Sequence, residues 1–230
     1  MNQPSAADPA ALHQLAGQIY IRLLEVYGLP EWRSPLPAVD ELVCTILSQN
    51  TNDRNRDIAY NALRAALPTW EQVRDADPAL VMAAIRPAGL ANQKGPRIQA
   101  VLRQISEERG NLDLSFLKEM ETAEAHAWLT RFNGVGPKTA AIVLVFSLDK
   151  PAFPVDTHIY RVSGRLGLRP EKMSVEDAHP HLASLFAPET YGPAHLNLIR
   201  LGREICLARK PNCPACPVSG LCAYYRASGG

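Results

Sequence analysis

Residues 132–148 read FNGVGPKTAAIVLVFSL. Gly134 and Gly136 permit a tight turn and the close approach of another backbone. Pro137 suits the first turn of a following helix, where an amide hydrogen has no intrahelical partner. An apolar run then continues to the end of the stretch. The stretch therefore predicts a helix-hairpin-helix, in which two helices are joined by a glycine turn.

Apolar residues recur at a spacing of three to four in nearly every other segment, and no period-two run of strand length is present. We therefore expect an all-α protein in which proline and glycine mark the joints between helices. The expected helices cover residues 10–26, 38–48, 53–66, 79–85, 94–108, 123–132, 137–148, 157–166, 175–186 and 191–206.

A second glycine turn, PAGL at residues 87–90, also precedes a predicted helix. Free amides and the positive end of the dipole at a helix N-terminus attract phosphate, so such a hairpin can grip nucleic acid without a basic side chain. A glycine turn between helices is more often a plain connection, and the motif alone does not decide between the two interpretations.

Lys138 lies in the first turn of the apolar helix that follows Pro137. Repulsion from the helix dipole and partial desolvation both favour the neutral amine, which is the nucleophilic form. The alternative is an ordinary lysine whose ammonium extends to solvent.

Asp156 opens the segment VDTHIYR at residues 155–161. An aspartate at this position is expected to cap the helix that begins at residue 157. The same carboxylate can also accept a proton or stabilise a cationic transition state.

Residues 206–222 read CLARKPNCPACPVSGLC, which places four cysteines in the pattern C-x6-C-x2-C-x5-C. A zinc ribbon usually has two C-x2-C pairs, whereas staggered short spacers suit an iron–sulfur cluster. Disulfides are the other alternative, but the N-terminus lacks the basic and apolar regions of a secretory signal. We therefore expect a metal centre in a cytoplasmic protein, with Cys44 as a buried core residue.

The net charge of +1 on 230 residues gives no general indication of nucleic-acid binding. Basic residues gather near the cysteines, where they fit phosphate contacts or a solvated charged face. The longest apolar run is far shorter than the roughly 20 residues that cross a bilayer, so no membrane association is expected.

Three motifs now stand in one order: GVGPKTA at 134–140, VDTH at 155–158 and the spaced cysteines. Together they resemble the endonuclease III family of the helix-hairpin-helix (HhH-GPD) DNA glycosylase superfamily, over about residues 35–222. The resemblance implies a two-lobed all-α fold. A six-helix domain would span 37–149, a discontinuous domain made of 1–36 and 150–230 would carry the cluster, and DNA would lie in the cleft between them.

The resemblance also implies a bifunctional DNA glycosylase and AP lyase of base excision repair that removes oxidised pyrimidines from duplex DNA. Lys138 would attack the sugar C1′, expel the base and form a Schiff base that permits β-elimination. Asp156 would activate that amine and offset the cationic charge. A [4Fe-4S] cluster would be held by the thiolates of Cys206, Cys213, Cys216 and Cys222.

The expected partner is double-stranded DNA with damaged bases or abasic sites, bound by a monomer. Family members fill the gap left by a flipped nucleotide with side chains from two loops. Here the usual glutamine position holds Asn50, with Gln49 one residue earlier, and the sequence leaves open which of them acts. The full set of expected DNA contacts is Gln49, Asn50, Leu90, Gly134, Gly136, Thr139, His158, Arg209 and Lys210. Asp53 is expected to cap the helix that follows the first loop.

Two other functions are compatible with the motifs. A monofunctional adenine or mismatch thymine glycosylase would lack the strand cleavage that Lys138 indicates. A non-catalytic iron–sulfur protein that binds damaged DNA would use Lys138 only as a phosphate contact.

Overall fold

The structure is a computed structural model that describes residues 8–30 and 35–229. Within these ranges the protein is helical and contains no β-strand, so the predicted all-α class is confirmed. The chain divides into two compact units. The continuous unit comprises Ser34–Lys150, and the discontinuous unit combines Met1–Arg33 with Pro151–Gly230.

The continuous unit is built around α2 and α8, which pack against each other. Every residue of α2 from Ala38 to Leu47 is buried, as are most residues of α8. The surrounding helices each contribute an apolar face to this core. In chain order the elements are α2 (Ala38–Ser48), α3 (Asp53–Ala66), α4 (Trp70–Asp75), α5 (Pro78–Ile85), η1 (Arg86–Ala88), α6 (Ala91–Arg109), η2 (Ser115–Glu119), α7 (Thr122–Thr130) and α8 (Pro137–Ser147).

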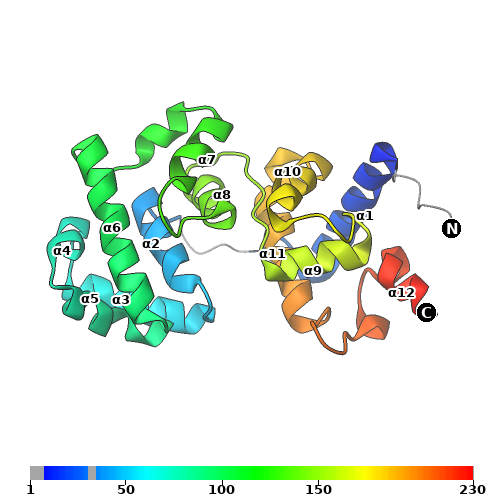
Figure 1. Cartoon of the computed structure of the whole chain (residues 1–230). Helices are drawn as coiled ribbons and strands as arrows, with labels where there is room; N and C mark the ends of the chain where they lie inside the picture. The colour runs from blue at the N-terminus through cyan, green and yellow to red at the C-terminus, as the bar shows by residue number, and fades with distance from the viewer. Residues whose placement is uncertain (1–7, 31–34, 230) are drawn as a thin grey trace. The chain divides into compact units, whose positions relative to one another are not determined.

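The discontinuous unit joins the N-terminal helix to the C-terminal part of the chain. In Figure 1 the blue α1 lies among the yellow to red helices, and both α10 and α11 pack against it. Its buried face carries Ala16, Ile19 and Leu23. The elements are α1 (Pro9–Tyr27), α9 (Thr157–Leu166), α10 (Val175–Leu185), η3 (Pro188–Thr190), α11 (Tyr191–Glu204), η4 (Cys213–Ala215), η5 (Ser219–Leu221) and α12 (Ala223–Ala227).

The helices at residues 38–48, 53–66 and 157–166 have the predicted bounds. Two short helices, α4 and α12, were not predicted. The start of α4 carries a readable signal, because Thr69 and Gln72 form a capping box in which each side chain bonds the other's backbone amide.

The prediction that Asp53 caps α3 is wrong. The side chain of Asn52 is the cap, since it accepts a hydrogen bond from the Asn55 amide at 2.9 Å. Asp53 instead lies in the first turn, where its carboxylate pairs with Arg56 at 2.9 Å. A carboxylate is also favourable there, because it faces the positive end of the helix dipole.

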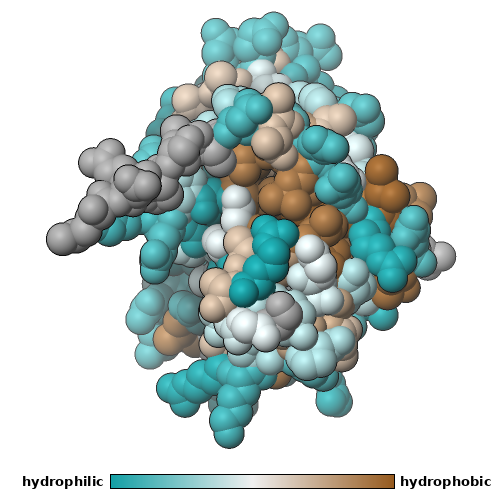
Figure 2. Space-filling model, turned by 90° about the vertical axis from the view of Figure 1, so that its right-hand side faces the viewer, coloured by the Kyte–Doolittle hydropathy of each residue, from teal (hydrophilic) through white to brown (hydrophobic). Residues whose placement is uncertain are grey.

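Figure 2 shows one face of the molecule, where hydrophobic side chains gather near the centre and hydrophilic ones surround them. In the part of the chain that the structure describes, none of the helices combines the length and apolar character needed to cross a membrane.

Candidate functional site

The glycine turn at residues 132–136 joins α7 to α8. A hydrogen bond from the Val135 amide to the Phe132 carbonyl closes it at 3.0 Å. Gly134 has a φ of 84°, in the left-handed region that a residue without a Cβ enters at little cost. Phe132 and Val135 are buried and anchor the turn in the continuous unit, while Gly136 stays exposed.

Helix α8 begins directly after this turn, with Gly136 as its N-cap residue and Pro137 at its first position. No side chain among the described residues caps it. The positive end of the helix dipole is therefore available to an anion. Lys138 is half-buried in the first turn. Thr139 lies in the same turn and is buried.

The loop that follows α2 reaches this hairpin through Gln49. Its side-chain Nε2 donates a hydrogen bond to the Gly134 carbonyl at 3.1 Å, and its Oε1 accepts one from Arg97 Nη1 at 3.1 Å. Asn50, in contrast, is exposed and has a left-handed backbone with a φ of 53°. The two candidates for the gap-filling residue therefore differ in the structure. The side-chain amide of Gln49 is hydrogen-bonded within the protein, whereas Asn50 is exposed to solvent.

The second loop lies between η1 and α6. Gly89 has a φ of 69°, and Leu90 follows as the N-cap residue of α6 with a φ of 51°. Leu90 is also 46% exposed, although leucine is an apolar residue. A left-handed conformation costs a residue with a Cβ about 1–2 kcal/mol, so the fold holds this side chain outward against both strain and solvation.

Asp156 caps α9, as predicted. Its carboxylate accepts a hydrogen bond from the Ile159 amide at 2.7 Å. The segment before it is held by two buried histidines of the discontinuous unit: His195 Nδ1 lies 2.9 Å from the Pro154 carbonyl, and His179 Nδ1 lies 3.1 Å from that of Phe153. Asp156 is thus positioned on both its N-terminal and C-terminal sides.

His158 lies in the first turn of α9 and is half-buried. Its Nδ1 is 3.1 Å from Arg161 Nη2. A Cβ built at Gly202 of α11 would lie only 3.0 Å from the His158 Cβ. The ring therefore packs where α9 meets α11, and this placement favours a packed histidine over a pocket residue.

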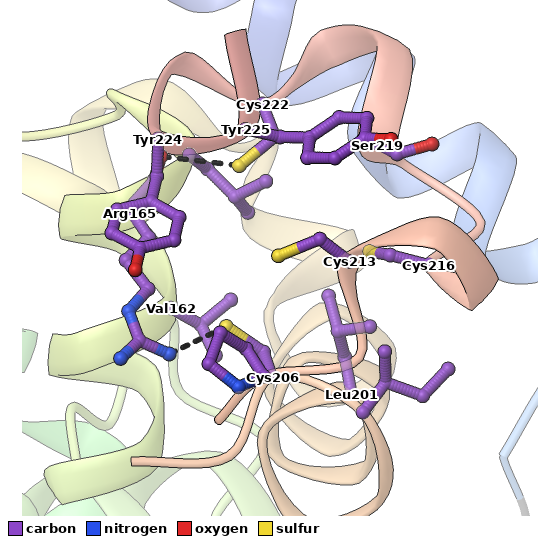
Figure 3. A pocket seen from close by; sticks show the side chains of 13 residues that line it. Val162, Arg165, Leu201, Cys206, Cys213, Cys216, Ser219, Cys222, Tyr224 and Tyr225 are labelled. Carbon is purple, nitrogen blue, oxygen red and sulfur yellow. Dashed lines mark hydrogen bonds between the residues drawn. The ribbon is translucent and has the colours of Figure 1, made fainter. Parts of the chain in front are cut away.

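The four cysteines of residues 206–222 border one cavity of about 360 Å³, a volume that includes the part open to solvent. Figure 3 shows the sulfurs of Cys206, Cys213 and Cys222 directed toward a common space. All five cysteines of the chain are described, and each is a free thiol. Within the described ranges, no group of three or more His, Cys, Asp or Glu side chains could hold a metal ion. The four thiols of residues 206–222 thus line a cavity and do not converge closely enough to hold a single metal ion.

The chemistry of this donor set fits an iron–sulfur cluster. Burial raises the pKa of the Cys216 thiol, and the negative charge of the other three thiols raises it further. Four thiolates held together in this way repel one another, and a cationic metal core removes that repulsion. An inorganic core larger than one ion also suits thiols that line a cavity.

Arg165 of α9, which the sequence did not single out, braces the cysteine segment. Its guanidinium donates hydrogen bonds to Cys206 Sγ at 3.4 Å, to the Leu207 carbonyl at 2.7 Å and to the Ala208 carbonyl at 3.0 Å. The same loop then presents Arg209 and Lys210 to solvent. Both predicted phosphate contacts are thus exposed, and Arg165 fixes the backbone of the loop just before them.

Arg97 was also missed, and its position depends on Gly134. A Cβ built at Gly134 would lie 2.1 Å from the Arg97 Cδ. The arginine side chain therefore rests against the hairpin turn while it bonds Gln49. Nothing in the local sequence around residue 97 indicates this contact, because its partners are far away in the chain.

Comparisons with known proteins agree with this arrangement. Residues 43–188 match the model of the HhH-GPD superfamily base excision DNA repair proteins. Residues 206–222 match the iron–sulfur binding domain of endonuclease III, a segment that begins and ends at predicted ligands.

Among curated relatives, endonuclease III of Sulfolobus acidocaldarius is 32% identical over 92% of this chain and 96% of its own length. A putative DNA glycosylase of Arabidopsis thaliana is 38% identical over 63% of this chain, and the match spans about half (49%) of that relative. A solved non-covalent endonuclease III–DNA complex superposes with a TM-score of 0.79 at 25% identity, covering 94% of this chain and 98% of the other. The predicted two-lobed glycosylase fold is thereby confirmed.

Proposed function

The chain belongs to the HhH-GPD superfamily of base excision DNA repair proteins as an endonuclease III-like DNA glycosylase with a [4Fe-4S] cluster, and we propose that it is bifunctional. In this proposal it removes oxidised pyrimidines from duplex DNA and then cleaves the strand at the abasic site. The observation that carries the proposal is the position of Lys138, an amine in the first turn of α8 directly after an uncapped glycine turn.

The glycine turn and the start of α8 form the proposed phosphate grip. Amides at the start of the helix and the dipole bind the DNA backbone, which brings a sugar to the side chain of Lys138. A base inside a duplex is out of reach, so the damaged nucleotide must first flip out, at a cost of a few kcal/mol that is smallest for a poorly stacked base.

Lys138 Nζ then attacks C1′, and the bond from C1′ to the base nitrogen breaks as the base leaves. Opening of the sugar ring leaves a Schiff base between Nζ and C1′. Loss of a proton from C2′ and of the phosphate from C3′ cleaves the strand by β-elimination, and water finally releases the lysine. We assign Asp156 to deprotonation of the amine and to stabilisation of the cationic sugar.

The gap left by the flipped nucleotide is filled, in this proposal, by Asn50 and Leu90. Both side chains are exposed at left-handed positions of the continuous unit. The hydrogen bonds of Gln49 favour Asn50 over Gln49, because a gap-filling Gln49 would have to release both Gly134 and Arg97.

The cluster holds the loop that carries Arg209 and Lys210, which we assign to phosphate contacts. Arg165 fixes the backbone just before these two residues, which supports a structural role for the whole segment. We further propose that the protein acts as a monomer on damaged chromosomal DNA in the cytoplasm.

Borohydride trapping tests the proposal, because reduction converts only a genuine Schiff base into a stable adduct. The substrates are duplexes with a thymine glycol or an abasic site, and Lys138→Ala is the control variant. We expect a covalent adduct with the wild-type protein and none with the variant, while both bind an uncleavable abasic analogue with similar affinity, since one lost phosphate contact weakens binding only modestly.

Two outcomes would overturn the bifunctional assignment. Release of free base without an adduct would indicate a monofunctional glycosylase. Tight binding of damaged DNA with neither adduct nor free base would indicate a non-catalytic binding protein.

A further inference from the structure

Lys94 is the largest fully buried side chain of the described protein, with an exposure of 1%. It lies in the first part of α6, where its ammonium donates two hydrogen bonds of 2.8 Å, to the Leu47 carbonyl and to the Ala88 carbonyl. The acceptors come from separate segments of the continuous unit, the end of α2 and the end of η1.

A lysine in this position is costly for the fold. Burial lowers the pKa of Lys94, which means that the charged form is destabilised relative to solvent. Both acceptors are neutral carbonyls, which offset less of the desolvation cost than a carboxylate would. An apolar side chain of similar length would avoid that cost, although it would leave both carbonyls without this donor.

The two carbonyls share one property: each immediately precedes a loop with a candidate gap-filling residue. Leu47 leads to Asn50, and Ala88 leads to Leu90. Asn50 and Leu90 have nearly the same left-handed backbone, with φ values of 53° and 51°. Strained residues of this kind persist where the surrounding structure over-determines them, and Lys94 ties the base of one loop to the base of the other.

We propose that Lys94 is a positioning residue that holds the two gap-filling loops at a fixed separation. The inference rests on the proposed function, which assigns gap filling to Asn50 and Leu90. Lys94 is buried and does not touch DNA itself. Its ammonium sets the spacing between two side chains that must enter the DNA stack together, and a loop displaced by about 1 Å can cost up to two orders of magnitude in rate.

Gln99 provides a matched control on the same helix. It is also 1% exposed, and its Nε2 donates hydrogen bonds to the Val73 carbonyl at 3.0 Å and the Ala76 carbonyl at 2.9 Å. The same kind of contact there ties α6 to the C-terminal part of α4 and to Ala76 just after it, a region with no residue assigned to DNA. A purely structural role would make the two side chains equivalent.

The experiment compares Lys94→Met with Gln99→Met in the full-length, cluster-loaded protein. Each variant binds a duplex with an abasic analogue opposite 2-aminopurine, whose fluorescence reports on insertion of side chains next to it. Single-turnover excision at saturating enzyme is measured on a thymine glycol duplex, and thermal unfolding provides the stability of each variant.

We expect Lys94→Met to reduce the fluorescence change and to slow excision about tenfold or more. Gln99→Met should leave both nearly unchanged at an equal or greater loss of stability. Lys94→Gln, which keeps a shorter uncharged donor, should give intermediate values and replaces Lys94→Met if the latter does not fold.

Equal effects of the Lys94 and Gln99 variants would overturn the positioning role and leave the proposed function intact. A wild-type protein that excises the base without any 2-aminopurine signal would instead contradict the gap-filling assignment, and the role of Lys94 would fall with it.

Discussion

The two glycine turns of the continuous unit resemble each other in sequence and differ in what they present. Both contain a glycine with positive φ, 69° at Gly89 and 84° at Gly134, and both lead into a helix. The first turn ends on the exposed Leu90, whereas the second buries Val135 and ends on Gly136. The first therefore presents a side chain and the second presents backbone amides.

Each turn is also held by a side chain from outside the turn. Lys94 bonds the Ala88 carbonyl in the first turn, and Gln49 bonds the Gly134 carbonyl in the second. A glycine turn alone therefore does not determine whether a side chain or backbone amides are presented. The residues around the turn decide whether it exposes an apolar side chain or backbone amides.

The largest expected effect comes from adding a Cβ to each turn glycine. Gly134→Ala places the new atom 2.1 Å from the Arg97 Cδ, whereas the Cβ of Gly89→Ala meets nothing within 4 Å. Both variants carry the strain of a positive φ, about 1–3 kcal/mol. Gly134→Ala must also displace Arg97 from Gln49, so we expect a greater loss of stability and about a tenfold loss of affinity for abasic-analogue DNA.

Urea unfolding and DNA titration of the two variants test this difference. Equal losses of stability and affinity in Gly134→Ala and Gly89→Ala would show that the contact with Arg97 contributes nothing to the second turn.

The next effect concerns the apolar wedge. Leu90→Asn keeps a residue that tolerates a left-handed backbone, so the free energy of unfolding should stay the same or rise by up to about 1 kcal/mol. Excision should fall about tenfold, because a polar asparagine replaces the apolar side chain that inserts between the bases. Leu80→Asn is the control, because Leu80 is another exposed leucine of the same unit, at 47% against 46% for Leu90. Single-turnover kinetics that slow equally in both variants would contradict the wedge.

A smaller effect separates the two residues of the first loop. Gln49→Leu removes the bonds to Gly134 and Arg97, so we expect a loss of about 1 kcal/mol in stability. Asn50→Gly keeps the left-handed backbone available and should leave stability within about 0.5 kcal/mol. Excision should nevertheless slow more in Asn50→Gly than in Gln49→Leu when both are measured at saturating enzyme. The reverse order would identify Gln49 as the gap-filling residue.

The smallest effect is a dependence of stability on alkaline pH. Burial lowers the pKa of Lys94 in the folded protein relative to its ordinary value near 10.5 in the unfolded chain. Between the two values the unfolded chain binds more protons, so rising pH favours the folded state. The stability of the wild type relative to Lys94→Met should therefore rise as pH rises from neutral toward that ordinary value.

Unfolding free energies of both proteins at several pH values measure this change, and other titrating groups cancel in the difference. A difference that stays constant with pH would show that Lys94 does not titrate differently in the folded and unfolded states.

The sequence by itself determined the features that depend on neighbouring residues. The glycine turn before Pro137, the cap at Asp156, the spacing of the four cysteines and the bounds of α2, α3 and α9 all follow from interactions within a few positions. These interactions are local hydrogen bonds, backbone dihedral preferences and ligand spacings, which a sequence displays directly.

Only the tertiary structure decided which long-range partner each side chain has. Gln49 meets Gly134 across 85 positions, Lys94 meets Leu47 across 47 positions, and Arg165 meets Cys206 across 41 positions. No local pattern marks these residues, because a lysine, glutamine or arginine is usually solvated. Packing of helices buried Lys94, partly buried Gln49 and Arg165, and selected their acceptors, since a polar group removed from water must find a hydrogen-bond partner.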